Sequence, residues 1–308
     1  MPSVDATGYV NITINGTNYQ SLNQLNTTRY AIFNVSGLVA GDYNVTVTYR
    51  GDNNYNPSNN YSTFTVSKTN ITDIKVSVEN VTYGENETVK VTVSDYNVTG
   101  SVKIYIYANE GDTTAIDSTT VDLTNGVASW NVSGLAAKEN YYVVAVYNGD
   151  DNYNATTLDA GKATALFNVT KAQSHVNIRA VDIRVGKDEI VTVYLLNLNA
   201  SGTIVINIIN STGDIVYTKT EAFTNTSADG ITYTFTGLPI GKYNATVNYT
   251  GDVNYNDSYD SSEFTVSQIG LSANDTVYKE NLTVTVETPD YANGNIQLLS
   301  VIITKHSI

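Results

Sequence analysis

The chain has 308 residues, no cysteine and a formal net charge of −14. The absence of cysteine excludes thiol catalysis, thiolate metal sites and disulfide bonds, and the acidic balance disfavours nucleic acid and anionic membranes, which are bound through clustered Lys and Arg. No apolar run reaches the roughly 18 residues of a membrane-spanning helix, and residues 1–5 have neither the basic nor the apolar region of a signal peptide.

One stretch occurs three times and organises the rest of the chain. Its clearest copy covers residues 37–56, a close copy covers 237–255, and a looser one covers 134–153. Within the first copy, residues 43–49 alternate Tyr or Val with Asn or Thr, which is typical of a strand with one buried side. Equivalent tyrosines lie 98 and 102 residues apart, about the length of an immunoglobulin-like domain.

Each copy opens with a turn that leads into a tyrosine. The pattern Leu-x-x-Gly-x-Tyr, with Leu38, Gly41 and Tyr43 in the first copy, resembles the tyrosine corner of immunoglobulin-like sandwiches. In that corner the tyrosine hydroxyl bonds to backbone upstream. The second copy departs from the pattern, because residues 138–140 add one residue and replace the glycine before Tyr141.

The second repeat, residues 69–171, is complete and predicts seven strands. The strands are short, alternating and separated by Gly, Asn, Asp and Ser clusters, as in all-β sandwiches. They are expected at residues 73–79, 88–94, 100–107, within 114–123, and at 127–132, 141–147 and 163–169. The third repeat, residues 172–268, predicts the same order, with strands at 189–195, 202–208, 232–235 and 264–266 among them.

The two ends of the chain are incomplete in complementary ways. Residues 1–68 begin with a strand that matches the third strand of the second repeat, so this first repeat lacks strands A and B. Residues 269–308 supply A-like and B-like strands at 271–278 and 282–287, then a third strand-like segment. Either the chain is a fragment of a longer array, or the final strands of one molecule complete the first repeat of another.

The missing strands have a consequence for the first repeat. Without them, the inward faces of Phe33 and Val35 should stay open, and an unpaired apolar sheet edge favours association. We therefore expect residues 1–67 to be the least stable part of the chain.

The repeated pattern G-L-x-x-G-x-Y-x-V-x-V-x-Y-x-G-D-x-x-Y, with strands rich in Thr and Asn, resembles the bacterial immunoglobulin-like repeats of methanogen adhesin-like proteins. The resemblance covers nearly the whole chain. It implies an all-β fold of tandem immunoglobulin-like sandwiches in a linear array, within a large archaeal protein of the cell surface. It also implies that neighbouring repeats are partners of one another, and it leaves the ligand open because such repeats often act as stalks.

No catalytic set of residues can be assembled from the sequence. The two histidines, His175 and His306, lie between repeats and in the C-terminal tail, and there is no phosphate-binding glycine loop, zinc motif or nucleophile elbow. Paired carboxylates such as Asp150 and Asp151 lie in a loop that recurs in every repeat, whereas an enzyme is expected to have one site. We therefore expect no enzymatic activity.

The loop after each repeated strand is a candidate calcium site. Oxygen-bearing side chains occupy alternate positions, as in the first half of a calcium-binding loop. They are Asp52, Asn54 and Asn56; Asp150, Asn152 and Asn154; and Asp252, Asn254 and Asn256. None of the three loops has the glycine of an EF-hand. The alternative is that Asp and Asn cap a turn while Tyr55, Tyr153 and Tyr255 close the end of a sandwich.

One face of the second repeat should differ from its counterparts. Strand alternation places Asn and Thr on the outer face of the first and third repeats, but aromatic and aliphatic residues on that of the second. This second set is Tyr105, Tyr107, Tyr142, Val144, Val146 and Leu166. Because their strands share a sheet, we expect one exposed patch that binds a protein or a glycan, unless another part of the chain covers it.

About twenty Asn-x-Ser/Thr sequons are candidate glycosylation sites in a surface protein. Strand alternation in a chain rich in Asn and Thr also produces the pattern N-V-T, so we expect most of them to be unused. They include Asn11, Asn34, Asn44, Asn80, Asn131, Asn168, Asn244 and Asn281.

The sequence as a whole predicts a non-enzymatic, extracellular segment of an adhesin or stalk, with an unidentified protein or glycan ligand on another cell or on the cell wall. Two alternatives stay open at this point. One is a fibre-forming subunit that exchanges strands head to tail, and the other is a carbohydrate-binding module.

Overall fold

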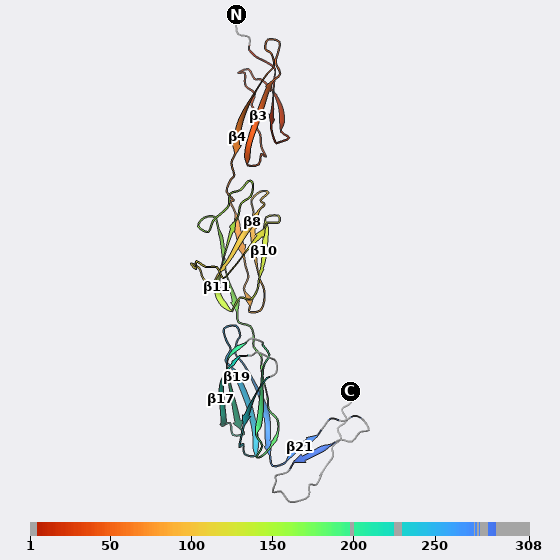
Figure 1. Ribbon diagram of the computed structural model, residues 1–308, viewed down its shortest axis with the longest axis vertical. Coiled ribbons are helices and arrows are strands. Elements are labelled where there is room, and N and C mark those ends of the chain that lie inside the picture. The colour runs from red at the N-terminus through yellow and green to blue at the C-terminus, as the bar shows by residue number, and fades with distance from the viewer. Residues whose placement is uncertain are drawn as a thin grey trace. The chain divides into compact units, whose positions relative to one another are not determined.

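The computed structural model describes residues 5–197, 200–224, 230–273, 275, 277 and 283–287 of the chain. These residues form strands β1 to β22 and no helix (Figure 1), so the all-β prediction is confirmed and no helix among them could span a membrane. The chain divides into two compact units, residues 1–169 and 170–308. His306, the sequon Asn281 and the third strand-like segment expected near the C-terminus lie outside the described residues.

The first repeat contains one four-stranded antiparallel sheet, and no second sheet among its described residues. The strands are β1 (Tyr9–Ile14), β2 (Gln20–Gln24), β3 (Gly41–Tyr49) and β4 (Ser58–Val66). They lie in the order β2-β1-β3-β4 (Figure 1, red to orange). Val10, Ile12 and Ile14 of β1 face the same side and are buried, as period-two alternation requires.

The second repeat is a sandwich of two sheets. Its strands are β5 (Ile74–Ser77), β6 (Val81–Thr82), β7 (Glu87–Val93), β8 (Ser101–Tyr107), β9 (Asp117–Asp122), β10 (Val127–Val132), β11 (Lys138–Tyr147) and β12 (Ala163–Thr170). One sheet has the order β10-β7-β5 and the other the order β6-β12-β11-β8-β9. Inward residues of both sheets, including Val91, Ile104 and Val143, are completely buried and form one core.

The third repeat has the same strand order. Its strands are β13 (Val176–Arg179), β14 (Ile183–Arg184), β15 (Glu189–Leu195), β16 (Ser201–Asn210), β17 (Ile215–Thr224), β18 (Ile231–Phe235), β19 (Gly241–Tyr249) and β20 (Ser258–Ser267). The two sheets are β13-β15-β18 and β14-β20-β19-β16-β17, so each strand has a counterpart in the second repeat. After it, β21 (Gly270–Ala273) and β22 (Val284–Glu287) form a two-stranded antiparallel sheet of their own.

In both sandwiches the chain crosses from one sheet to the other near its start. The strand predicted over residues 73–79 contains β5, and the structure adds β6, which the sequence does not predict and which lies beside β12 in the other sheet. At the crossing, the backbone N–H of Glu79 donates to Glu87 Oε1 at 3.0 Å. Val181 donates to Glu189 Oε1 at 3.1 Å in the third repeat. A buried glutamate thus satisfies a backbone donor that has left the strand ladder.

The corner tyrosine forms its predicted contact in all three repeats. The hydroxyl groups donate to upstream carbonyls, Tyr43 to Val39 at 2.8 Å, Tyr141 to Ala136 at 3.0 Å and Tyr243 to Pro239 at 2.8 Å. In the second repeat the additional residue is absorbed by a bulge, because the pairing register shifts between Lys138 and Tyr141. Asn140 takes a φ of 59° there, a left-handed conformation that Asn tolerates better than most residues.

Candidate functional site

The loop after each repeated strand holds an aspartate whose two carboxylate oxygens both bind protein donors. Asp150 Oδ1 accepts hydrogen bonds from the backbone N–H groups of Asn152 and Tyr153, both at 2.8 Å. Its Oδ2 accepts from the backbone N–H of Thr99 at 2.8 Å and from the Thr99 hydroxyl at 2.9 Å. Asp150 therefore closes its own turn and fixes that turn to the segment before β8. We call this arrangement the Asp clamp.

The Asp clamp recurs in the other two repeats. Asp52 Oδ1 accepts from Asn54 and Tyr55, and its Oδ2 accepts from the backbone N–H of Thr7 at 2.6 Å. In the third repeat, Asp252 makes the same bonds to Asn254, Tyr255 and Ser201. The aspartate of each loop therefore caps a turn, and calcium binding by these loops stays a prediction.

The clamp lowers the pKa of its aspartate. Burial raises the pKa of the Asp150 carboxyl, but the hydrogen bonds from Thr99, Asn152 and Tyr153 outweigh burial and bring it to about 2. Hydrogen bonds led by that of Thr7 also hold the pKa of Asp52 well below its usual range. Each clamp is therefore anionic at neutral pH.

In the second repeat, the side chains of both asparagines of the calcium candidate form hydrogen bonds with other parts of the protein. Asn152 Oδ1 accepts the backbone N–H of Ala40 at 2.9 Å, and Asn154 Nδ2 donates to Asn70 Oδ1 at 2.9 Å. Asn54, Asn56 and Asn256 are exposed, and Asn254 is half-buried. Within the described residues no group of three His, Asp or Glu side chains could hold a metal ion.

The clamp loop also receives the entry segment of its own repeat. In the second repeat, Thr69 N–H donates to the Asn152 carbonyl at 3.0 Å, and Asn154 N–H donates to the Thr69 carbonyl at 2.8 Å. Ala172 makes the corresponding pair with Asn254 and Asn256 at 2.9 Å each. The preceding lysines, Lys68 and Lys171, donate to the carbonyls of Asp150 and Asp252. Entry segment and clamp loop are thus joined in the same way twice.

The six residues expected to form an exposed patch do share one face of a sheet. In the pairing of β8 with β11, Tyr142 lies opposite Tyr107 and Val144 opposite Tyr105, while Leu166 of β12 lies opposite Tyr142. The expected exposure is wrong for Tyr107, Val144 and Val146, which are 8%, 2% and 7% exposed. One reason is that the bulky rings of this face pack on one another.

The tyrosine rings form a row along this face. Ring centroids are 6.1 Å apart between Tyr105 and Tyr107 and 6.4 Å apart between Tyr107 and Tyr142. The Nζ of Lys103 lies 5.1 Å from the centre of the Tyr105 ring. Tyr105 and Tyr142 stay half-buried and Leu166 is 52% exposed, so the accessible part of the patch is narrower than predicted.

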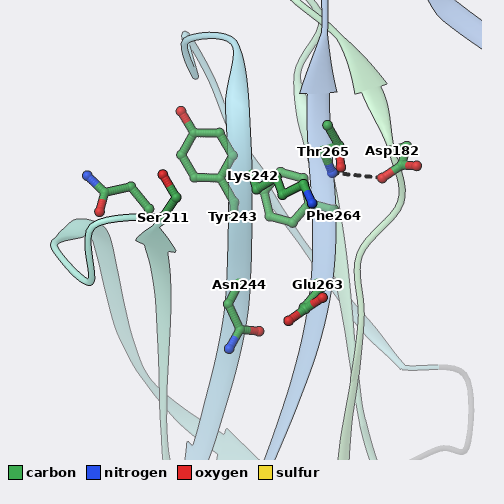
Figure 2. A pocket seen from close by; sticks show the side chains of 9 residues that line it. Asp182, Ser211, Lys242, Tyr243, Asn244, Glu263, Phe264 and Thr265 are labelled. Carbon is green, nitrogen blue, oxygen red and sulfur yellow. Dashed lines mark hydrogen bonds between the residues drawn. The ribbon is translucent and has the colours of Figure 1, made fainter.

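A polar hollow of about 540 Å³ lies on the third repeat and is not predicted by the sequence. Figure 2 shows its walls, with Tyr243 and Asn244 on β19 and Glu263 and Phe264 on β20. The backbone N–H of Thr265 donates to Asp182 Oδ1 at 2.7 Å across one side. Its lining combines one lysine with the carboxylates of Asp182 and Glu263 and with the amides of two asparagines.

Several sequon asparagines use their side chains inside the fold. Asn168 Oδ1 accepts the N–H of Asn140, Asn80 Oδ1 accepts the N–H of Asn168, and Asn131 Oδ1 accepts the hydroxyl of Thr88. Asn34 is exposed. Glycosylation of any of them stays a prediction.

The inner face of the first-repeat sheet is an open apolar hollow of about 610 Å³, which we call the first-repeat trough. It is lined by Ile12 and Ile14 of β1, Val45 and Val47 of β3, Phe64 and Val66 of β4, and Phe33, Val35 and Leu38 of the segment before β3. The predicted openness of Phe33 and Val35 is confirmed, since both are only half-buried.

Residues 74–165 match the bacterial Ig-like domain, group 3. No curated protein matches the chain. The Ig-like match coincides with the second repeat, and the strand order of that repeat recurs in the third. The second and third repeats are therefore Ig-like sandwiches in tandem.

Two similar solved structures are also built from repeats. One is a tetra-tandem repeat in the extending region of a large adhesion protein, 19% identical with a TM-score of 0.43, covering 86% of this chain and 68% of that one. The other comprises the fibronectin(III)-like modules of Clostridium thermocellum CbhA, 16% identical with a TM-score of 0.25, covering 62% of this chain and 94% of that one. With scores this low, the Ig-like assignment rests on the strand order and on the family match.

Proposed function

We propose that the chain is a segment of a non-enzymatic cell-surface adhesin, in which Ig-like repeats act as a spacer. The observation that carries the proposal is the repeated connection between entry segment and clamp loop. Thr69 and Ala172 are each fixed by two backbone hydrogen bonds to the loop of their own repeat. The resemblance of the repeated motif to methanogen adhesin-like proteins supports the same role.

The connection suits a spacer for a mechanical reason. A spacer transmits tension from one repeat to the next through the segment that joins them. Backbone hydrogen bonds at the start of a repeat hold that segment without long, flexible side chains, and ordering such side chains would cost conformational entropy. Asp150 and Asp252 in turn fix the same loop to the segment before β8 and to the first residue of β16, so the sheet shares the tension.

Surface location is tested by proteolysis of intact cells of the source organism. The proposal expects peptides of this chain, for instance from the exposed segment 157–162, to be released before lysis. Peptides of an abundant cytoplasmic enzyme should be absent from the same supernatant. Release only after lysis would overturn the proposal.

The spacer role is tested by single-molecule pulling on the purified chain. The second and third repeats should unfold in separate steps of similar length, on the order of 300 Å each for roughly 100 residues at about 3.3–3.6 Å per residue. A single cooperative step, or extension without force peaks, would contradict a spacer made of independent Ig-like repeats.

A second candidate function is a contact surface for a protein or a glycan on the face formed by β8, β11 and β12. It is favoured by the tyrosine row and by the exposure of Leu166. Because Tyr107 and Val144 are buried, the informative variant replaces Tyr105, Tyr142 and Leu166 by Thr. Glycan-array or cell binding that is unchanged in this variant would reject the surface as the ligand site.

A further inference from the structure

The first-repeat trough is a surface that the other two repeats bury. Val45 and Val47 of β3 are half-buried, whereas their counterparts Val143 and Ala145 are 0% exposed. Phe64 of β4 is likewise half-buried, whereas its counterpart Phe167 is 2% exposed. In the complete repeats this face is covered by the three-stranded sheet, which is β10-β7-β5 in the second repeat. The trough is therefore the face that a second sheet covers in the other two repeats, and the described residues of the first repeat form no such sheet.

Residues 30–35 of the first repeat correspond to one strand of the three-stranded sheet, although they form no strand here. The sequence Val-Ser-Gly-Leu begins at the last residue of β10, at residues 132–135, and recurs at 35–38, so residues 30–35 correspond to β10. Ala31, Phe33 and Val35 are half-buried there, while Ile32 is 71% exposed, which is the alternation of a strand. Yet these residues are not assigned to a strand, because no neighbouring strand pairs with them. They lack the counterparts of β7 and β5.

The hairpin formed by β21 and β22 has the pairing of the missing strands. Leu271 lies opposite Val286, just as Val76 lies opposite Val91 in the pairing of β5 with β7. The sequence Glu-Asn-x-Thr-Val-x-Val occurs at residues 280–286 and at 85–91, so β22 corresponds to β7 in the same register.

The hairpin is also apolar where the complete repeats are buried. Val284 is 45% exposed and Val286 is half-buried. Their counterparts in β7, Val89 and Val91, are both 0% exposed. Among the described residues, the first-repeat sheet therefore has an open apolar face, and the β21–β22 hairpin pairs with no further strand.

We propose that the β21–β22 hairpin of one copy of the chain completes the first repeat of a second copy. β22 pairs antiparallel with residues 31–35 and turns Val284 and Val286 into the first-repeat trough, while β21 lies on its far side. The mode is strand addition to an open sheet, in which backbone hydrogen bonds supply affinity and alternate side chains supply register. A segment upstream of residue 1, in a chain that has one, would compete for the same face.

The proposal fixes the register. Ser129 of β10 lies opposite Lys90 of β7, and Asn131 lies opposite Thr88. Transferred to the first repeat and the hairpin, these pairs become Ile32 with Thr285 and Asn34 with Thr283. Ile32, Asn34, Thr283 and Thr285 are exposed in the structure, so cysteines introduced there leave both cores intact.

Disulfide trapping tests this register, because the natural chain has no cysteine. A chain with Ile32→Cys is mixed under mild oxidant with a tagged chain that carries Thr285→Cys, and Asn34→Cys is mixed with Thr283→Cys. The controls exchange the partners, so that Ile32→Cys meets Thr283→Cys and Asn34→Cys meets Thr285→Cys. Opposite Cβ atoms are about 4.5–5.5 Å apart and diagonal ones about 7–8 Å, while a disulfide needs about 3.5–4.5 Å.

The expected result is a covalent heterodimer formed several-fold faster in the two in-register mixtures than in the two controls. Equal rates in all four mixtures, or no heterodimer in any, would overturn the proposal. A single chain with both Ile32→Cys and Thr285→Cys distinguishes the occupant. If it forms the bond only within a monomer, the hairpin closes on its own chain and the second copy is excluded.

Sedimentation provides an independent measurement without cysteines. Trough and hairpin are different surfaces, so their contact is head-to-tail and should yield a series of oligomers that lengthens with concentration. Val286→Asp should abolish the series, while Val277→Asp, at a site that is 63% exposed and outside both strands, should not. Oligomers that persist in Val286→Asp would overturn the proposal. None of these outcomes bears on surface location or on the unfolding of the complete repeats, which test the spacer function separately.

Discussion

At the scale of single residues, the Asp clamp is the feature that the repeats share most closely. Asp150 accepts four hydrogen bonds from Thr99, Asn152 and Tyr153, and charged acceptors form stronger hydrogen bonds than neutral ones. The clamp joins two segments that are distant along the chain. Loss of the clamp should therefore lower the stability of the whole sandwich and not only that of the loop.

We predict that Asp150→Asn lowers the free energy of unfolding of the second repeat by about 1.5–3 kcal/mol, the range for hydrogen bonds to a charged group. The single tryptophan, Trp130 on β10, reports the unfolding of this repeat by fluorescence in a denaturant titration. The neighbouring Asp151→Asn serves as the control, because Asp151 is exposed and should leave the midpoint unchanged. Equal midpoints for the two variants would contradict the clamp.

The same carboxylate predicts how acid affects the repeat. The pKa of Asp150 is about 2 in the folded state, below the value of about 3.9 expected in the unfolded chain. The folded state therefore binds its proton less readily, so the stabilisation is complete above about pH 4 and is lost as pH falls through 4 towards 2. The Trp130 midpoint should fall across this window, and Asp150→Asn should flatten that part of the profile.

The buried carboxyl of Glu87 predicts the opposite dependence of stability on pH. Burial raises the pKa of its carboxyl despite the hydrogen bond from Glu79, and Oε2 has no hydrogen-bond partner among the described residues. A raised folded-state pKa stabilises the repeat below the unfolded value of about 4.3, and this contribution is lost as pH rises through the folded value.

Glu87→Gln should therefore raise the free energy of unfolding at pH 7, by on the order of 1 kcal/mol, because it keeps the acceptor for Glu79 and removes an unpaired buried charge. At pH 4 the gain should vanish. Denaturant titrations at both pH values, with the exposed Glu139→Gln as control, measure the difference. A loss of stability at pH 7 would show that the charge is compensated.

At the scale of elements, the bulge at the start of β11 explains how one repeat accommodates an additional residue. Asn140 adopts a φ of 59°, and its N–H donates to Asn168 Oδ1 at 2.8 Å. The bulge lets Tyr141 reach the same corner contact as Tyr43 and Tyr243. The motif alone could not reveal this, because its spacing is broken at that point.

We expect Asn140→Val to lower the stability of the second repeat by about 1–2 kcal/mol, since a β-branched residue disfavours the left-handed conformation. Asn140→Gly keeps the conformation accessible and should be neutral or slightly stabilising. Denaturant midpoints of the two variants separate a backbone effect from loss of the side chain. Similar losses in both would place the effect in the Asn side chain.

Alternation of apolar and polar residues predicts strands that have one buried and one solvent-exposed face, as for β7, β8 and β11. It misses the short strands β6 and β14, because two residues are too few to show a period and their pairing depends on a sheet crossing. It also overestimates the exposure of Tyr107 and Val144. Alternation assigns a side chain to a face, but only packing against neighbouring rings decides whether that face is open.

At the scale of the whole molecule, protection from hydrogen exchange should be uneven. Backbone amides of β1 to β4 belong to a single sheet with an open trough, whereas those of β7 and β15 lie in completed sandwiches. We predict that residues 5–67 exchange at a free energy well below that of the second repeat when the protein is dilute. Protection that is equal in the two repeats at every concentration would contradict the open trough.

The Asp clamp and the entry-segment bonds have a genetic consequence. Asp150 binds Thr99, and Asn152 and Asn154 bind Thr69, so the partners of each contact are encoded within one repeat. Asp252, Ser201 and Ala172 form the same closed set in the next. A duplication or deletion of one complete repeat therefore leaves these contacts with their partners, whereas the bonds of Lys68 to Asp150 and of Ala40 to Asn152 join successive repeats. We therefore expect that the gain or loss of one complete repeat would require no compensating substitution at the Asp clamp or at its entry segment.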